Sequence, residues 1–520
     1  MKIRNLFFDS PWSWLWTPLG LAAAFPPLPF GPIAAVALVP FFRTAMRRGP
    51  GAMLAVGYAA GLIWSAATLY WIAWPTALGF IGAMLILPAA FAVFGCALSW
   101  LGGVWGGKAL VTAPFLWAGL EIISARGDLA FPWNMLAVVC TPGPVWIQFA
   151  DRTGAAGVSF WIVLLNVLVV AVLMNRRDVK RTAAAVTGLV LALLLPLAYG
   201  TRAMGRPALP EPAKPVRISL LQGNVDPYKK WTPAFLDSNF IIFDRLTRRA
   251  AVEYRPDLVV WPETATACYL RHRFLYLNWI KHLTDSLNLH ILTGSHDYDW
   301  SAEDSIRTYN AAFLLRPGSW DIDRYCKMRL VPFSERVPWV DRIPILRRLA
   351  FRVRSDMGDY TAGDSTGVFV MTLRDGRSVR LSPLICFESV FPDLAVRCAA
   401  AGAEFLIVIT NDGWFGDTSG PRQHAAIASL RAVENRRWIA RCANTGISGF
   451  IDPCGRMVSK TRFNREEVLS GEIVPRSELT FFTRHPRLFG GTVLGADLFF
   501  LLAALVIRFR NRGRRLRGAA

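Results

Sequence analysis

The sequence predicts a membrane-embedded α-helical bundle of about eight spans that carries one α/β domain. Apolar segments of roughly bilayer length follow one another through the first part of the chain, and a further one lies near the C-terminus. Between them, residues 215–475 alternate strand-like and helix-like patterns. Basic residues gather beside the apolar segments. We therefore expect an N-terminal transmembrane bundle over residues 1–205, an α/β domain over 215–475, a final span over 490–508 and a basic tail over 509–520.

The composition excludes an ordinary soluble protein. The 520 residues are 53% hydrophobic and carry a net charge of +21. Such a basic balance could indicate nucleic-acid binding, but basic and acidic residues nearly cancel between residues 215 and 472. The excess lies in short clusters next to apolar runs, as membrane topology requires. We expect membrane association and no nucleic-acid partner.

The predicted spans are apolar runs, the first two of which are short and rich in proline. A single run of this kind could be a buried core helix, but no soluble core needs so many in series. The eight segments are Pro11–Phe25, Gly31–Phe42, Ala52–Trp74, Phe80–Leu101, Ala109–Ile123, Gly157–Met174, Ala183–Tyr199 and Thr492–Ile507.

Basic clusters predict the orientation of the spans. If all eight cross, every cluster falls on one side, which the positive-inside rule identifies as the cytoplasm. Both termini are then cytoplasmic and the α/β domain faces outward. The first span lacks a small-residue cleavage site and is expected to remain as an anchor. The clusters are Lys2 and Arg4; Arg43, Arg47 and Arg48; Arg176, Arg177, Lys180 and Arg181; and Arg508, Arg510, Arg512, Arg514, Arg515 and Arg517.

The outward segment reads as an α/β sandwich that follows the proline-rich linker "GRPALPEPAKP". Strands are expected at "VRISLLQGNV", "DLVVWPE", "HILTGS", "AAFLLRPG", "LSPLICFE", "EFLIVITNDGW" and "GISGFIDPCG". Amphipathic helices are expected at "PAFLDSNFIIFDRLTRRAAVEY", "FLYLNWIKHLTDSLN" and "HAAIASLRAVENRRWIARCA".

Three reactive side chains follow strands in this segment, where α/β folds usually place chemistry: Glu263, Lys327 and Cys386. A thiol with a pKa of roughly 8.5 needs a base to become a nucleophile at neutral pH, and a carboxylate can supply one. An ammonium can stabilise the thiolate and then an oxyanion, and the N–H of Phe387 could be a second oxyanion donor. Together they predict acyl-transfer chemistry through a cysteine.

Each residue also has a structural interpretation. Glu263 could cap a helix, Lys327 could be a solvated lysine, and Cys386 could be an inert core thiol. Six of the eight cysteines lie in the α/β segment, and an extracytoplasmic compartment permits disulfides. Because a nucleophile must be a free thiol, we predict that Cys386 is unpaired. The six histidines show no zinc-binding spacing, and we expect neither metal nor cofactor.

The sequence motifs around these residues resemble those of the carbon–nitrogen hydrolase (nitrilase) superfamily. "VVWPET", "YCKMRLVPFSE" and "LICFES" match its Glu, Lys and Cys motifs in order and spacing. With the flanking spans, the layout resembles the apolipoprotein N-acyltransferase family, and "LLQGNVDPYKKW", "NDGWFGDTSGPRQH" and "FPWN" agree. The resemblance implies an αββα sandwich on a membrane bundle.

The resemblance also implies roles for individual residues. Glu263 would be the general base, Lys327 the oxyanion and thiolate stabiliser, and Cys386 the nucleophile. Glu335 would position Lys327 and the incoming amine. Accessory or substrate-binding positions would be Trp231, Phe387, Glu388 and Trp414. Many members carry tyrosine where this chain has Phe387, so a phenol hydroxyl is not available there.

The activity implied by the resemblance is transfer of an acyl chain from a phospholipid to the N-terminal amine of a diacylglyceryl-cysteine apolipoprotein. The expected setting is the bacterial inner membrane, with the catalytic domain on the periplasmic side, and the expected state is a monomer. The alternatives are a membrane-tethered amidase of the same superfamily and a non-enzymatic assembly or transport protein. Val337–Tyr360 mixes aromatic, aliphatic and basic residues, and we hypothesise a mobile arm that gates acyl entry.

Overall fold

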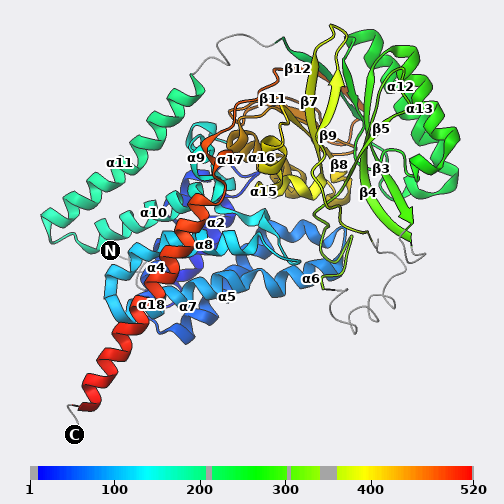
Figure 1. The fold of residues 1–520 in the computed structure, drawn as a ribbon. Coiled ribbons are helices and arrows are strands. Elements are labelled where there is room, and N and C mark those ends of the chain that lie inside the picture. Colours follow the sequence, from blue (N-terminus) through cyan, green and yellow to red (C-terminus); the bar gives the residue numbers. More distant parts are fainter. Residues whose placement is uncertain (1–9, 206–213, 301–305, 340–359, 518–520) are drawn as a thin grey trace. The chain divides into compact units, whose positions relative to one another are not determined.

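A computed structural model describes residues 10–205, 214–300, 306–339 and 360–517. The chain divides into two compact units (Figure 1). The first comprises residues 1–70, 80–204 and 485–520, and the second comprises residues 71–79 and 205–484. Most of the hypothesised arm at Val337–Tyr360 lies outside the described residues.

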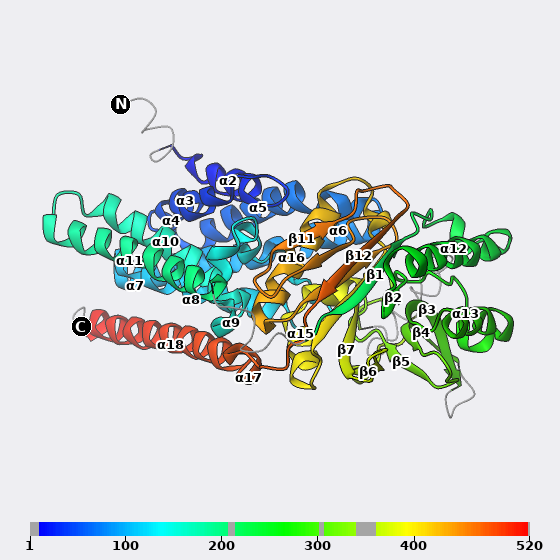
Figure 2. The same cartoon turned by 90° about the horizontal axis from the view of Figure 1, so that it is seen from above.

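The first unit is built of helices (Figure 2). Proline occupies the first position of both α5 and α7, where its missing N–H has no intrahelical partner to lose. The helices are α2 (Trp16–Ala24), α3 (Ala34–Ala37), α4 (Val39–Ala45), α5 (Pro50–Leu69), α6 (Ala77–Ile86), α7 (Pro88–Trp105), α8 (Ala113–Ser124), α9 (Ala150–Thr153), α10 (Ala155–Met174), α11 (Val179–Met204) and α18 (Leu488–Arg517).

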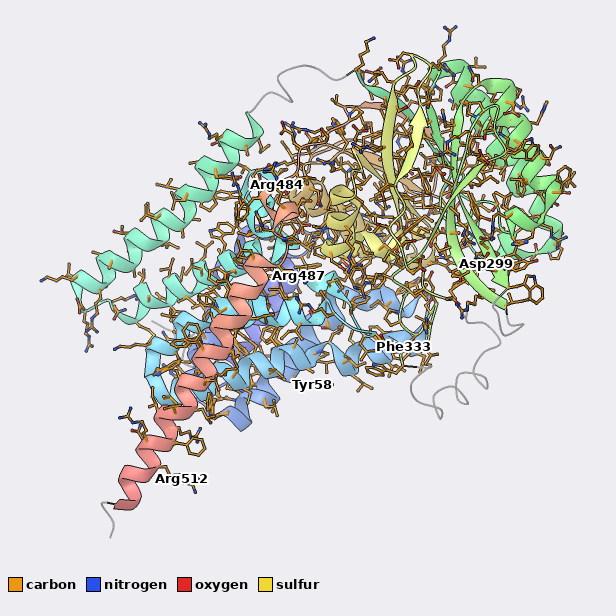
Figure 3. All side chains as sticks on the ribbon, viewed as in Figure 1. Tyr58, Asp299, Phe333, Arg484, Arg487 and Arg512 are labelled. Atoms are coloured by element: carbon orange, nitrogen blue, oxygen red, sulfur yellow. The ribbon has the colours of Figure 1, made fainter. Side chains whose placement is uncertain are left out.

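Five helical stretches within the described ranges are long and apolar enough to cross a membrane. They are Pro50–Ala73, Ala77–Ser124, Ala155–Met174, Val179–Met204 and Leu488–Arg512, and Gly31–Ala45 is a shorter apolar helix. Ala77–Ser124 has 48 residues, more than twice the length that one crossing needs. The count of eight crossings therefore stays a prediction. Arg487, which directly precedes α18, and Arg512, which lies within it, mark opposite ends of the apolar stretch Leu488–Arg512 (Figure 3).

Two glycines bring α5 and α7 into close approach. A Cβ on Gly57 would stand 2.5 Å from the carbonyl oxygen of Phe91, and one on Gly61 would stand 2.9 Å from the Cα of Pro88. The spacing of four residues puts both glycines on one face of α5. Such small-residue faces let helix backbones pack directly in membranes, where lipid offers no hydrophobic driving force.

The second unit contains two six-stranded sheets. The first has the order β12-β1-β2-β3-β4-β5 and the second the order β11-β10-β9-β8-β7-β6. The strands of the first sheet are β1 (Val216–Gln222), β2 (Leu258–Val260), β3 (His290–Trp300), β4 (Ile306–Leu315), β5 (Ile322–Cys326) and β12 (Glu467–Ile473). Those of the second sheet are β6 (Phe369–Thr372), β7 (Ser378–Ile385), β8 (Phe405–Thr410), β9 (Ile439–Ala443), β10 (Gly449–Ile451) and β11 (Met457–Lys460).

The two sheets pack face to face with helices outside them. Residues such as Ile218, Leu292, Leu381 and Ile407 from both sheets share one buried core. A second core joins the first sheet to α12 (Leu236–Tyr254) and α13 (Phe274–Leu287). The other sheet is covered by α15 (Pro392–Ala400) and α16 (Ser419–Asn435), and α17 (Phe481–Arg484) packs against these two helices. The αββα sandwich is confirmed.

All seven predicted strands are present, but the third predicted helix, over residues 424–443, extends too far toward the C-terminus. Helix α16 ends at Asn435, because Arg436 adopts a left-handed conformation with φ of 49°. The following Ile439–Ala443 forms β9 between β8 and β10, and all its residues are buried. A strand buried on both faces carries no polar alternation, so its sequence blends into the helix before it.

The approach of α5 to α7 leads to a stability prediction. We expect Gly57→Ala to lower the melting temperature of the detergent-solubilised protein, because the new methyl meets the α7 backbone. Overpacking of this kind costs about 1–3 kcal/mol. Gly51→Ala is the matched control, since a Cβ at Gly51 on the same helix meets nothing within 4 Å. Equal melting temperatures for the two variants would contradict the close packing.

Candidate active site

The structure brings the predicted carboxylates and lysine into one buried cluster. Lys327 directly follows β5, and its Nζ donates to Glu335 Oε1 at 2.7 Å and lies 3.5 Å from Glu263 Oε1. Only 1% of the Lys327 side chain is exposed. Burial alone would lower the pKa of this ammonium, but the charges of Glu335 and Glu263 outweigh it and raise the pKa. Lys327 therefore stays protonated at any physiological pH.

Glu263 is held by one residue inside a strand and by another that directly follows a strand. It follows β2, and its Oε1 accepts a hydrogen bond of 2.8 Å from Asn310 Nδ2 on β4. Its Oε2 accepts one of 3.1 Å from the backbone N–H of Asn411, which follows β8. Asn310 also donates to Glu335 Oε1 at 3.2 Å. One amide thus fixes both carboxylates around the ammonium of Lys327.

Cys386 begins a tight turn at the end of β7. Its φ of 51° is left-handed, a costly conformation for a residue with a side chain and one that gathers at functional sites. Burial raises the pKa of the thiol, the charge of Glu263 raises it further, and Lys327 acts in the opposite direction. The thiol is therefore protonated at rest, lies within electrostatic reach of both groups, and forms no disulfide.

Glu388 ties the Cys386 turn to the segment that carries Lys327. Its Oε2 accepts from the N–H of Ile385 at 2.8 Å. Its Oε1 accepts from Tyr325 Oη and from the N–H of Met328, both at 2.7 Å. Burial raises the pKa of this carboxyl despite these bonds. Glu388 is completely buried, so the structure gives it a positioning role rather than contact with a ligand.

The three aromatic residues predicted as accessory or substrate-binding positions differ in their exposure to solvent. Trp231 is 38% exposed and stacks on His296 with ring centroids 4.7 Å apart. Trp414 is partly exposed and meets the edge of Tyr228 at 5.1 Å. Phe387 is buried against Phe391, with centroids 5.0 Å apart. Trp231 and Trp414 can touch a ligand, whereas Phe387 packs the turn.

Sequence reasoning missed a buried polar network next to the backbone of Cys386. His424 Nε2 lies 3.1 Å from the carbonyl oxygen of Cys386, and its Nδ1 lies 3.0 Å from both Asp412 Oδ1 and Arg441 Nη2. Arg441 donates to Asp412 Oδ2 at 2.6 Å. Burial and the charge of Arg441 lower the pKa of His424. The ring of His424 thus joins the backbone of Cys386 to the ion pair of Asp412 and Arg441.

A second buried lysine was also missed. Lys230 Nζ donates to the backbone oxygen of Thr264 at 3.3 Å and lies 4.9 Å from the ring centre of Trp231. Burial lowers the pKa of Lys230 to about 8, although Glu263 acts in the opposite direction. The contact with Thr264, whose φ of 50° is left-handed, supports the backbone next to Glu263. "YKKW" offered no signal for which lysine is buried.

Because His424 belongs to the buried network next to Cys386, we predict that its replacement destabilises the protein. His424→Leu removes the buried side chain that contacts the Cys386 carbonyl oxygen, Asp412 and Arg441, and loss of a buried hydrogen-bond partner costs about 1–3 kcal/mol. We expect a lower melting temperature. His282→Leu is the control, because His282 lies exposed on α13. If both variants melt alike, His424 does not anchor the turn.

The lowered pKa of His296 leads to a prediction about how the stability of the protein depends on pH. Burial and then Lys230 lower its pKa to about 3, whereas an unfolded histidine has a pKa of about 6.5. Between these values the unfolded chain binds more protons, so stability falls as pH drops from about 6.5 toward 3. We expect His296→Gln to lose less melting temperature between pH 7 and pH 4.5 than wild type. An unchanged difference would contradict a neutral buried His296.

Comparison with known proteins places this geometry in a family. Residues 217–478 match the carbon–nitrogen hydrolase family, and residues 19–168 match the apolipoprotein N-acyltransferase N-terminal domain. The chain is 33% identical to an apolipoprotein N-acyltransferase of Chlorobaculum tepidum, over 93% of this chain and 95% of that relative. It is 33% identical to one of Geobacter metallireducens, over 94% of each chain. The chain therefore belongs to the apolipoprotein N-acyltransferase family.

Proposed function

We propose that this protein transfers a fatty acyl chain from a phospholipid to the N-terminal amine of a diacylglyceryl-cysteine apolipoprotein, through a thioester on Cys386. The observation that carries the proposal is the buried Glu263–Lys327–Glu335 cluster within electrostatic reach of that thiol. The full-length relatives named apolipoprotein N-acyltransferase support the substrates. The proposal assigns the chemistry to a catalytic triad of Glu263, Lys327 and Cys386.

In the first half-reaction the Cys386 sulfur attacks the ester carbonyl of the phospholipid. Glu263 accepts the thiol proton as the carbon–sulfur bond forms. The Lys327 ammonium stabilises the oxyanion of the tetrahedral intermediate. The carbon–oxygen bond to glycerol then breaks, and Glu263 returns the proton to the departing alkoxide. A lysophospholipid leaves, and the acyl chain stays on Cys386.

In the second half-reaction the neutral amine of the apolipoprotein attacks the thioester. Glu263 takes a proton from the attacking nitrogen, and Lys327 again stabilises the oxyanion. The carbon–nitrogen bond forms, the carbon–sulfur bond breaks, and the Cys386 thiolate recovers the proton. Glu335 holds Lys327 in place throughout. The two half-reactions share one site, so ping-pong kinetics are expected.

The membrane setting completes the proposal. Both substrates are lipid-anchored, which gives the apolar helices a reason beyond tethering. The basic clusters favour a periplasmic catalytic unit and cytoplasmic termini in a bacterial inner membrane, and the protein is proposed to act as a monomer. An amidase would use water in the second half-reaction instead of the amine. Matches across both units favour the transferase.

The thioester can be tested by intact-mass measurement. Incubation of the purified protein with phospholipid alone should add the mass of one acyl chain, because no amine is present to remove it. Cys386→Ala should gain nothing, and Cys454→Ala, which removes another cysteine of the same unit that forms no disulfide, should gain the chain as wild type does. An adduct that persists in Cys386→Ala would assign the acyl chain to another residue. A subsequent lipopeptide should remove the adduct, whereas release as free fatty acid would favour the amidase.

A further inference from the structure

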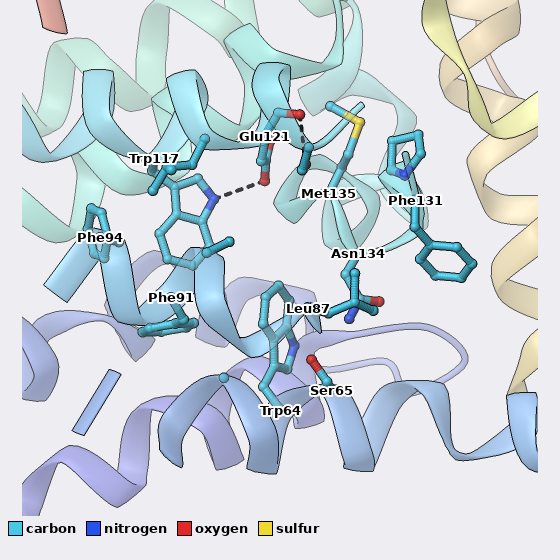
Figure 4. A pocket seen from close by; sticks show the side chains of 15 residues that line it. Trp64, Ser65, Leu87, Phe91, Phe94, Trp117, Glu121, Phe131, Asn134 and Met135 are labelled. Carbon is cyan, nitrogen blue, oxygen red and sulfur yellow. Dashed lines mark hydrogen bonds between the residues drawn. The ribbon is translucent and has the colours of Figure 1, made fainter. Parts of the chain in front are cut away.

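The helical unit contains a pocket that nothing in the proposed reaction uses. It lies at one end of this unit, between the C-terminal turns of α5 and α8, the first turns of α7, and the segment that contains Asn134. Its volume is about 90 Å³, several times the space that one water needs. Figure 4 shows Glu121 on one side of the pocket and Trp64 with Ser65 on the other.

Three buried polar atoms of residues that line this pocket have no partner in the protein: Glu121 Oε2, Asn134 Oδ1 and Trp64 Nε1. The other oxygen of Glu121 is fully engaged, because Oε1 accepts from Trp117 Nε1 at 2.9 Å and from the N–H of Leu136 at 2.7 Å. Ser159 lies near Glu121, but it makes no hydrogen bond of acceptable geometry to Oε2. Two acceptors and one donor are thus left for a ligand.

The lining determines which chemistry fits. No lysine, arginine or histidine is among the described residues of the pocket, so a phosphate or carboxylate would face Glu121 uncompensated. The rings of Trp64, Phe91 and Trp117 line it, and Phe91 meets Trp117 edge to face at 5.2 Å. Aromatic faces attract cations, and a carboxylate among them suits an ammonium with N–H donors.

The position of the pocket fits a lipid source for that ammonium. Arg43, Arg47 and Arg48 precede α5, so the positive-inside rule puts the C-terminal end of α5, and the pocket with it, toward the outward headgroup region. Ser124, Phe131 and Asn134 at the edge are only partly buried and leave the pocket open on that side. Ionisable residues inside membrane helices generally mark a functional site.

We propose that this pocket binds a primary ammonium group, held by Glu121 Oε2 and Asn134 Oδ1 among the aromatic side chains. The group comes from an aminophospholipid headgroup or from a free amine. A quaternary ammonium lacks the N–H donors, and a glycerol headgroup lacks the charge. The inference concerns the helical unit alone and does not depend on acyl transfer.

The test is native mass spectrometry of the full-length protein in detergent with three phospholipids of the same acyl chains. A Cys386→Ala background prevents any consumption of lipid. Phosphatidylethanolamine should bind about tenfold more tightly than phosphatidylcholine or phosphatidylglycerol, the difference expected for a charge-assisted hydrogen bond. Glu121→Gln should abolish this preference, because the amide keeps an acceptor for Trp117 and Leu136 but has no charge.

Asp497→Asn is the matched control. Asp497 is another carboxylate of the helical unit, on α18, and is not among the pocket residues. Its replacement should leave the preference intact. If Glu121→Gln does not fold, Asn134→Ala should still weaken the preference by removing the second acceptor. Equal binding of all three lipids, or a preference that survives in Glu121→Gln, would show that the pocket holds only water.

Free ethanolamine distinguishes the two sources of the ammonium. Displacement of phosphatidylethanolamine by millimolar ethanolamine would show that a soluble amine suffices. A lipid preference that ethanolamine does not disturb would assign the site to a membrane lipid. Either result supports recognition of the ammonium.

Discussion

The catalytic unit depends on one buried ammonium. Lys327 is almost completely enclosed, and its charge is tolerated only because Glu335 and Glu263 surround it. The ammonium and the two carboxylates carry one net negative charge next to a thiol that burial keeps protonated. In the proposed reaction, transfer of the thiol proton to Glu263 would leave this net charge unchanged and move the negative charge to sulfur. The low-dielectric site therefore does not oppose formation of the nucleophile, although it would strongly oppose loss of a proton to solvent.

The elements around this cluster serve to hold it. Asn310 fixes two carboxylates with one amide group, and Glu388 joins the Cys386 turn to the backbone after Lys327. His424 supports the same turn through the carbonyl oxygen of Cys386. These groups are buried and hydrogen-bonded, so each one is fixed by the fold rather than by a ligand. Preorganisation of this kind is the largest contribution that a protein makes to acyl transfer.

The sequence predicted the αββα sandwich and the strand-end positions of Glu263, Lys327 and Cys386, because reactive residues after apolar strands are visible in one dimension. It did not predict Asn310, which sits inside a strand with nothing unusual beside it. It also missed the pairing of His424 with Asp412 and Arg441, since α16 and β9 bring these residues together from distant positions. The third predicted helix was too long for a similar reason. Ile439–Ala443 is buried on both faces by neighbouring strands, and local periodicity cannot show these strands.

The pairing of β1 with β12 has a consequence for biogenesis. Residues 216–222 are made early, yet their antiparallel partner spans residues 467–473. At about 5–20 residues per second, β1 waits roughly 10–50 s for that partner. During this time it can pair with β2 alone, and one edge of an apolar strand stays open to aggregation. Emergence of β12 covers that edge and completes the first sheet. Shortly afterwards the chain reaches α18, so the catalytic unit becomes complete just before α18 of the helical unit is made.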